Sequence, residues 1–187
     1  MIEIRMCTDE VVISQTREWV SSVVIGDNFC PFAKKEMVNN TIRYVVCSPS
    51  LENTLMTLMS ECKNLDDTPA TETTLLIYPK GFDDFQAFLE LVTLADNLMS
   101  DQGYDGTYQL ASFHPDYCFA DSSVDDPANY TNRSPYPTLH LIREESIERV
   151  LQDIQNPEKI PERNVRYARD KGLDVMRSKL SECLKRH

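Results

Sequence analysis

The chain has 187 residues, 41% of them hydrophobic and 26% charged, and this composition is typical of one globular domain. A formal net charge of −11 excludes non-specific nucleic-acid binding, since such a chain repels phosphate backbones. No apolar run reaches the roughly 18 residues of a membrane span, and the N-terminus lacks a signal-peptide pattern. Six scattered cysteines without a C-x-x-C pair are typical of reduced thiols, so we expect a cytoplasmic protein without a membrane partner.

Apolar spacings of three, four and seven predict a first helix over 11–25, which Gly26 can end. Farther along, β-branched runs alternate with helical patterns that begin at serine or acidic caps. The predicted strands are 42–48, 73–79, 107–113 and 137–142. Helices are expected near 51–65 and 83–99, directly after the fourth strand, and in the tail from Pro161.

Two strand–helix crossovers favour parallel strands, whereas the last two strands are joined by a long loop and could pair either way. The predicted fold class is therefore α/β, with a roughly four-stranded mixed sheet and helices packed on it. No repeat or composition break divides the chain, so 1–187 is treated as a single domain of undetermined oligomeric state. The residues expected in the core are Trp19, Val23, Leu58, Leu76, Ile77, Phe88 and Leu141.

The segment "DPANYTNRSPYP", 126–137, belongs to a loop from about Pro115 to Pro137 that three prolines keep out of regular structure. Loops of this length inside a compact domain are usually functional or disordered, and the tyrosines of this loop predict that it packs over the sheet edge. Its amides, hydroxyls and the Arg133 fork suit recognition of a carboxylate or phosphate. The alternative is that these side chains cap their own turns.

His114 follows the third strand, at a position where α/β proteins bind ligands, and could act as an acid, a base or a metal ligand. We expect Asp126 or Asp116 to orient it, and Arg133 to share a concave surface with it. The alternative is a structural histidine. His140 alternates with Leu139 and Leu141 in the fourth strand, which is typical of a buried polar residue on the opposite face.

Cys30 precedes Pro31 and is interpreted as a helix N-cap, where free backbone donors lower a thiol pKa and favour the nucleophilic thiolate. The alternative is an apolar plug of Phe29, Cys30 and Phe32 between the first helix and the sheet. The His114–Cys118 spacing matches no metal signature, and the nearby aspartates lack the EF-hand pattern, so no metal site is predicted.

Four motifs in this order, "CPFA", "QLASFHP", "DDPANYTNRSPYPTLHLIRE" and "IPERN", resemble those of an uncharacterised protein family known chiefly from bacteria as a domain of unknown function. The resemblance covers nearly the whole chain. It implies that Cys30, His114, Asp126 and the 129–135 segment belong to the family's motifs, but it brings no activity with it.

Three functions remain open. The first is a small-molecule enzyme that binds an anionic, phosphate- or carboxylate-bearing metabolite between the strand ends and the 115–137 loop. Its catalytic residues would be His114, Asp126 and Cys30, and its binding residues would be Asn129, Tyr130, Asn132, Arg133, Ser134, Arg143 and Arg163. The second is a thiol-dependent redox or transferase protein using Cys30, and the third is a noncatalytic module that binds a metabolite or a protein. The sequence identifies no cofactor.

Overall fold

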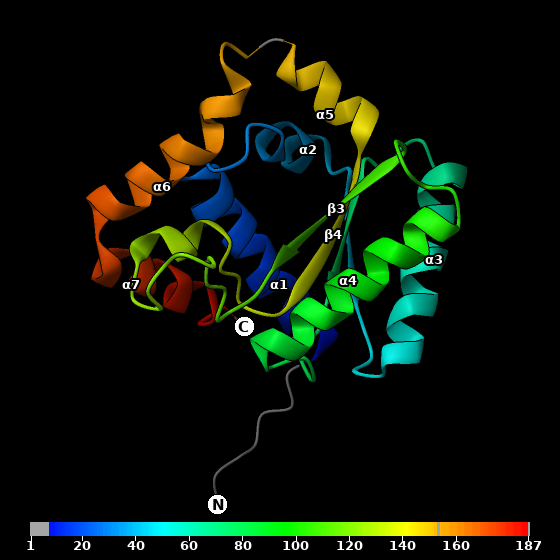
Figure 1. Cartoon of the computed structure of the whole chain (residues 1–187), viewed down its shortest axis with the longest axis horizontal. Helices are drawn as coiled ribbons and strands as arrows, with labels where there is room; N and C mark the ends of the chain where they lie inside the picture. Colours follow the sequence, from blue (N-terminus) through cyan, green and yellow to red (C-terminus); the bar gives the residue numbers. More distant parts are fainter. Residues whose placement is uncertain (1–7, 153, 187) are drawn as a thin grey trace, which may run out of the picture.

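A four-stranded mixed sheet in the order β1-β2-β4-β3 forms the centre of the computed structural model, which describes residues 8–152 and 154–186 (Figure 1). β1 and β2 are parallel, and β4 is antiparallel to both β2 and β3. This confirms the predicted α/β class and mixed sheet. The strands are β1 Ile42–Val46, β2 Thr73–Ile77, β3 Tyr108–Phe113 and β4 Thr138–Arg143.

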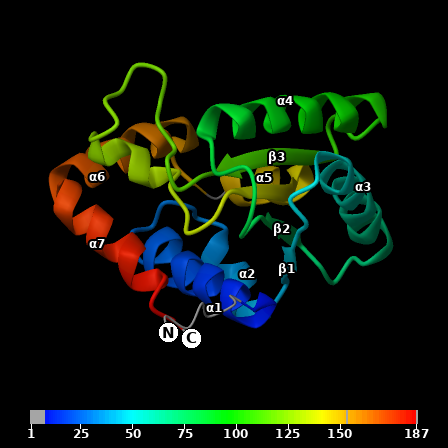
Figure 2. The same ribbon diagram turned by 90° about the horizontal axis from the view of Figure 1, so that it is seen from below.

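Helices cover both faces of the sheet, and Figure 2 shows the two layers on opposite sides. One layer holds the two crossover helices, α3 Leu51–Asp67 and α4 Phe85–Asp101. Ser50 and Asp84 cap them, since each side chain accepts a hydrogen bond from a backbone N–H of the first turn. The other layer holds α1 Asp9–Trp19, the π-helical segment η1 Val20–Ile25 and the short α2 Ala33–Asn39.

The C-terminal part of the chain begins at the sheet and then crosses to α1 (Figure 1). α5 Glu144–Leu151 follows β4 without a loop, and the 3-10 turn η3 Pro157–Lys159 leads into α6 Ile160–Lys171 and α7 Leu173–Cys183. The prediction of one final helix is wrong, because Gly172 has a φ of 84° and breaks the helical path. No helix in the described ranges has the length and hydropathy needed to cross a membrane.

Strand alternation divides the buried side chains into two cores. Leu76, Leu139 and Leu141 pack with Leu58 and Phe88 under α3 and α4. On the other face, Leu75 and Ile77 pack with residues of α1, η1, α6 and α7. All seven side chains predicted to be in the core are buried.

The first helix departs from α-helical geometry where it approaches the sheet. It begins at Asp9, and its last six residues are π-helical, with the N–H groups of Gly26 and Phe29 donating five residues back to Ser21 and Val24. Val20 and Val24, which are four residues apart, both belong to the core on this side of the sheet. Wide turns of this kind are frequent at functional sites.

Candidate functional site

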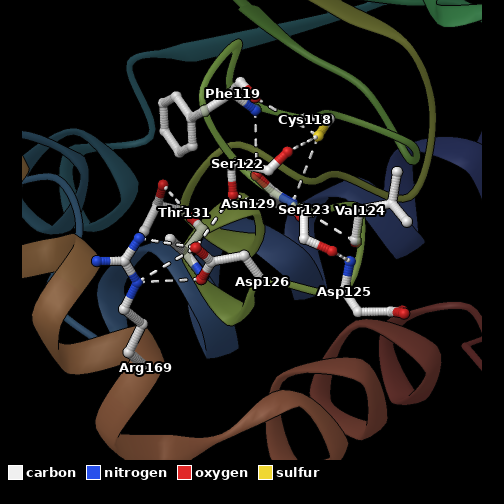
Figure 3. A network of polar contacts seen from close by, with 11 residues as sticks. Cys118, Phe119, Ser122, Ser123, Val124, Asp125, Asp126, Asn129, Thr131 and Arg169 are labelled. Carbon is white, nitrogen blue, oxygen red and sulfur yellow. Dashed lines mark hydrogen bonds and ion pairs between the residues drawn. The ribbon is translucent and has the colours of Figure 1, made fainter.

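The 115–137 loop is held mainly by its own side chains, as Figure 3 shows. A short 3-10 helix, η2 Pro127–Thr131, forms within it, because Pro127 occupies the first position, where no backbone donor is needed. Asn129 has no exposed surface; its Oδ1 accepts from the Phe119 N–H at 3.1 Å and its Nδ2 donates to the Ser123 carbonyl at 2.8 Å. The loop therefore follows the second interpretation, in which polar side chains cap their own turns.

Asp126 caps η2 and links it to α6. Its carboxylate accepts from the Ala128 N–H at 2.9 Å and pairs with Arg169 at 2.7 Å, the contact visible at the left of Figure 3. The Arg169 hydrogen bond, with help from the Ala128 N–H and Ser122, holds the pKa of Asp126 far below its usual range. These partners give Asp126 a structural position rather than the predicted one beside His114.

Arg133 binds carbonyl groups of its own loop. Nε donates to the Tyr117 oxygen at 3.1 Å and Nη2 to the Val124 oxygen at 2.9 Å, while the guanidinium lies over the Tyr130 ring at 4.6 Å. The prediction that Arg133 shares a concave surface with His114 is wrong, because His114 has no exposed surface at all.

Both ring nitrogens of His114 are used. Nδ1 accepts the Asp116 N–H at 3.0 Å, so Nε2 carries the proton that it donates to the Phe82 oxygen at 2.9 Å. The rings of Phe85 and Phe88 lie 5.1 Å away, centroid to centroid. This geometry is that of a structural histidine and does not support catalysis.

The other predicted binding residues hold separate parts of the chain together. Arg143 donates to the Thr71 oxygen at 3.1 Å and to the Leu65 oxygen, which joins β4 to the end of α3. Arg163 binds Asn164 and the Asn28 oxygen, which joins α6 to the turn after η1. Within the loop, Asn132 accepts from Thr131, Ser134 donates to the Tyr136 oxygen, and Tyr130 is buried in the core against α6 and α7. The predicted site residues are thus dispersed.

A pocket of about 140 Å³ lies instead on the sheet face that η1 and α2 cover, and α5 closes one side of it. The sheet contributes the apolar residues Ile42, Leu75, Ala111, Phe113 and Ile142. The helices and the turn before α2 add Trp19, Val20, Val24, Phe32, Ala33 and Val150. The wall is therefore almost entirely hydrocarbon.

Thr73 and His140 place one polar pair on this apolar floor. The Thr73 hydroxyl lies 2.6 Å from Nε2 of His140, and the Phe113 ring lies 6.2 Å from the imidazole, centroid to centroid. Burial lowers the pKa of His140 to about 4, so the ring is neutral at pH 7. His140 faces away from Leu139 and Leu141, as predicted, but it also lines the pocket.

Cys30 is the one predicted catalytic residue that lines this pocket. Burial raises the pKa of its thiol, and the N–H groups of Phe32 and Ala33 offset this only in part. The helix cap is Phe32 and not Cys30, although the N–H groups at the start of α2 do reach the sulfur as predicted. The prediction of a lowered thiol pKa is wrong, because burial moves it upward. The apolar-plug interpretation fits better, because Phe29 is buried and Phe32 lines the pocket.

The exposed residues Lys35 and Arg149 mark the opening between α2 and α5. The carboxylates of Glu36 and Glu72, which also line the pocket, balance the two positive charges. Glu36 accepts a hydrogen bond from Thr41 at 2.5 Å, and Glu72 accepts one from Ser146. The lining has no excess of positive charge, which does not favour a buried anion. No group of three or more potential metal ligands lies in the part of the chain that the structure describes.

The chain matches a known protein-family model. The model of the family described as "Protein of unknown function (DUF1415)" matches residues 11–178. Searches of curated proteins and of solved structures found no match.

Proposed function

The chain belongs to this family of proteins of unknown function, and we propose from its pocket that it binds a small, mainly apolar molecule between η1, α2, α5 and the sheet. The binding site is the pocket of about 140 Å³ with an apolar wall and the Thr73–His140 pair on its floor. Few polar groups in an otherwise apolar concavity are typical of small-molecule sites, where they fix the orientation of the ligand.

The pocket volume supports a ligand of about one ring. An apolar protein cavity of about 150 Å³ stays dry and takes up benzene. The Trp19 and Phe113 rings, whose centroids lie 5.1 Å apart in an edge-to-face arrangement, offer aromatic surface on one side of the pocket. A larger ligand would extend through the opening past Lys35 and Arg149.

Thiol chemistry has less support than binding. A nucleophilic cysteine needs a thiolate at neutral pH, and burial raises the pKa of Cys30. Burial also lowers the pKa of His140, so no charged imidazolium is present to stabilise a thiolate. An anion-binding enzyme centred on the loop has less support too, because Arg133 and His114 are occupied by other groups.

Trp19 makes the proposal testable, because it is the single tryptophan of the chain and it lines the pocket. Titration with toluene, followed by tryptophan emission, is expected to give a saturable change. Thermal melts with toluene should show a concentration-dependent rise in the melting temperature, since a ligand that binds only the folded state stabilises it.

A filled pocket provides the control. Ala111→Leu adds three carbons at the floor of the pocket and should abolish the toluene response, while Ala87→Leu, on the exposed surface of α4, should leave it intact. A saturable response that persists in a folded Ala111→Leu protein would place the ligand elsewhere. Absence of any response in the unchanged protein would refute the proposed function.

A further inference from the structure

The Thr73 hydroxyl fixes which nitrogen of His140 carries the proton. Thr73 has one hydroxyl hydrogen, which it donates to the Leu141 carbonyl oxygen at 2.5 Å. At its 2.6 Å contact with Nε2 of His140, the same oxygen must therefore accept, so Nε2 is the protonated nitrogen. The sheet register sets this geometry, because His140 lies opposite Leu75 and is thus a diagonal neighbour of Thr73 across the β2–β4 pair.

Nδ1 of His140 is consequently a bare acceptor. The described part of the chain contains no hydrogen bond to it. Among the described residues, four side-chain polar atoms are both buried and without a hydrogen-bond partner, and they belong to Asp27, Tyr44, Thr74 and Tyr78. Nδ1 of His140 is not one of them, so this nitrogen is not sealed from solvent. His140 lines the pocket, and its unpaired Nδ1 is not among the sealed atoms, so we take the pocket to be the space that this lone pair faces.

We propose that the pocket selects small apolar molecules that carry a hydroxyl, phenols above all, and that the ligand hydroxyl donates its hydrogen to Nδ1 of His140. This inference rests on the proposed function, whose ligand it specifies. The aromatic rings of Trp19 and Phe113 in the same pocket favour a ring over an open chain.

Polar groups that only accept hydrogen bonds fit Nδ1 poorly. A carboxylate, a ketone or an ether would place its lone pairs against the lone pair of Nδ1, because these groups only accept hydrogen bonds. The charged residues of the lining that could compensate a carboxylate, Lys35 and Arg149, are exposed at the opening and not at the floor. A neutral donor is thus the complement of this floor.

Phenol and toluene provide a matched pair of probes, since they differ by a hydroxyl in place of a methyl group. Dissociation constants of both are measured by tryptophan emission for the unchanged protein and for His140→Leu. Because a hydrogen bond of ordinary strength changes an equilibrium constant by about 3- to 10-fold, the ratio of phenol to toluene affinity should fall by that factor in His140→Leu. Because the measured quantity is the ratio of the two affinities, a change of pocket shape that weakens phenol and toluene equally cancels, and only the hydroxyl-specific part remains.

A second measurement needs no substitution. Long-range ¹H–¹⁵N NMR of the unchanged protein distinguishes the two neutral tautomers of His140, and we expect Nε2 protonated and Nδ1 bare. Addition of phenol, and not of toluene, should shift the Nδ1 resonance.

The outcomes separate the two proposals. Binding of toluene together with an unaltered phenol-to-toluene ratio in His140→Leu, or with a protonated Nδ1, would overturn the hydroxyl inference and leave the pocket proposal standing. Failure of both probes to bind the unchanged protein would overturn both. A lowered ratio with a bare Nδ1 supports both.

Discussion

His114 and His140 differ in what surrounds the same imidazole ring. His114 has hydrogen bonds at both nitrogens and no exposed surface. Within the described part of the chain, His140 has a hydrogen-bond partner at Nε2 only, and it lines the pocket. The sequence could not separate them, because each lies in or next to an apolar strand and the distinction depends on residues distant in the chain, Phe82 for His114 and Thr73 for His140.

His140 should make stability depend on pH. Its pKa is about 4 in the folded protein and about 6.5 in the unfolded chain, so between these values the unfolded state binds the extra proton. The free energy of unfolding should therefore fall as pH decreases from about 6.5 to about 4, by up to about 3 kcal/mol from this residue. Urea unfolding at several pH values, compared with His140→Leu, measures this contribution.

The comparison with His140→Leu removes the contribution of the other titrating groups. Glu36 and Glu72 line the same pocket and remain in the variant, as do Cys30, Lys35 and Arg149. A smaller pH dependence between pH 4 and 6.5 in the variant is the expected result. Equal pH dependence of the two proteins would mean that His140 titrates normally.

At the scale of elements, the 115–137 loop contains the polar groups that the sequence indicated, but they bind one another. Asn129, Asp126 and Arg133 each satisfy backbone groups of the loop or pair with α6. Composition alone gives the inventory of donors and acceptors and does not say which of them remain free. The polar residues of the loop motif thus stabilise the folded loop itself.

Arg133→Ala should destabilise the loop without affecting the pocket. The variant frees the carbonyl groups of Tyr117 and Val124, and we expect a loss of about 1–3 kcal/mol and a melting temperature lower by several degrees. Arg133→Lys should be destabilised as well, because an ammonium lacks the fork that reaches both carbonyls. Thermal melts with and without toluene measure stability and binding together.

The matched control is Arg166→Ala, which removes an exposed arginine that pairs with Glu162 one turn away on α6. This change should cost less than about 0.5 kcal/mol. Unaltered stability of Arg133→Ala, or loss of its toluene response while it remains folded, would contradict the structural role of Arg133.

Element boundaries were predicted within a few residues where the signal is local. The four strands and the helices α3 and α4 come from strong apolar patterns with caps. The π-helical end of the first helix and the break at Gly172 were missed. The π-helical turn was missed because a pattern of apolar residues shows which face of a helix is buried but not how many residues one turn contains. The break at Gly172 was missed because a single glycine is tolerated within a helix.

At the scale of the molecule, the mixed sheet followed from the order of strands and helices, because strand–helix crossovers favour parallel strands. β1 and β2 are parallel neighbours, whereas β4 lies between β2 and β3 and is antiparallel to both. The pocket could not be predicted from the sequence, because the residues that line it are spread along the chain from Trp19 on α1 to Val150 on α5. The available signals were the polar residues Thr73 and His140 within two apolar strands. Their contact depends on the β2–β4 register, which the sequence leaves open.

NOEs between toluene and methyl groups of the methyl-labelled protein show directly whether this pocket binds a small apolar ligand. We expect intermolecular NOEs to methyl groups of four residues that line the pocket, Val20, Val24, Leu75 and Ile142. NOEs confined to exposed side chains such as Met56 and Leu94, on the opposite layer of helices, would contradict it.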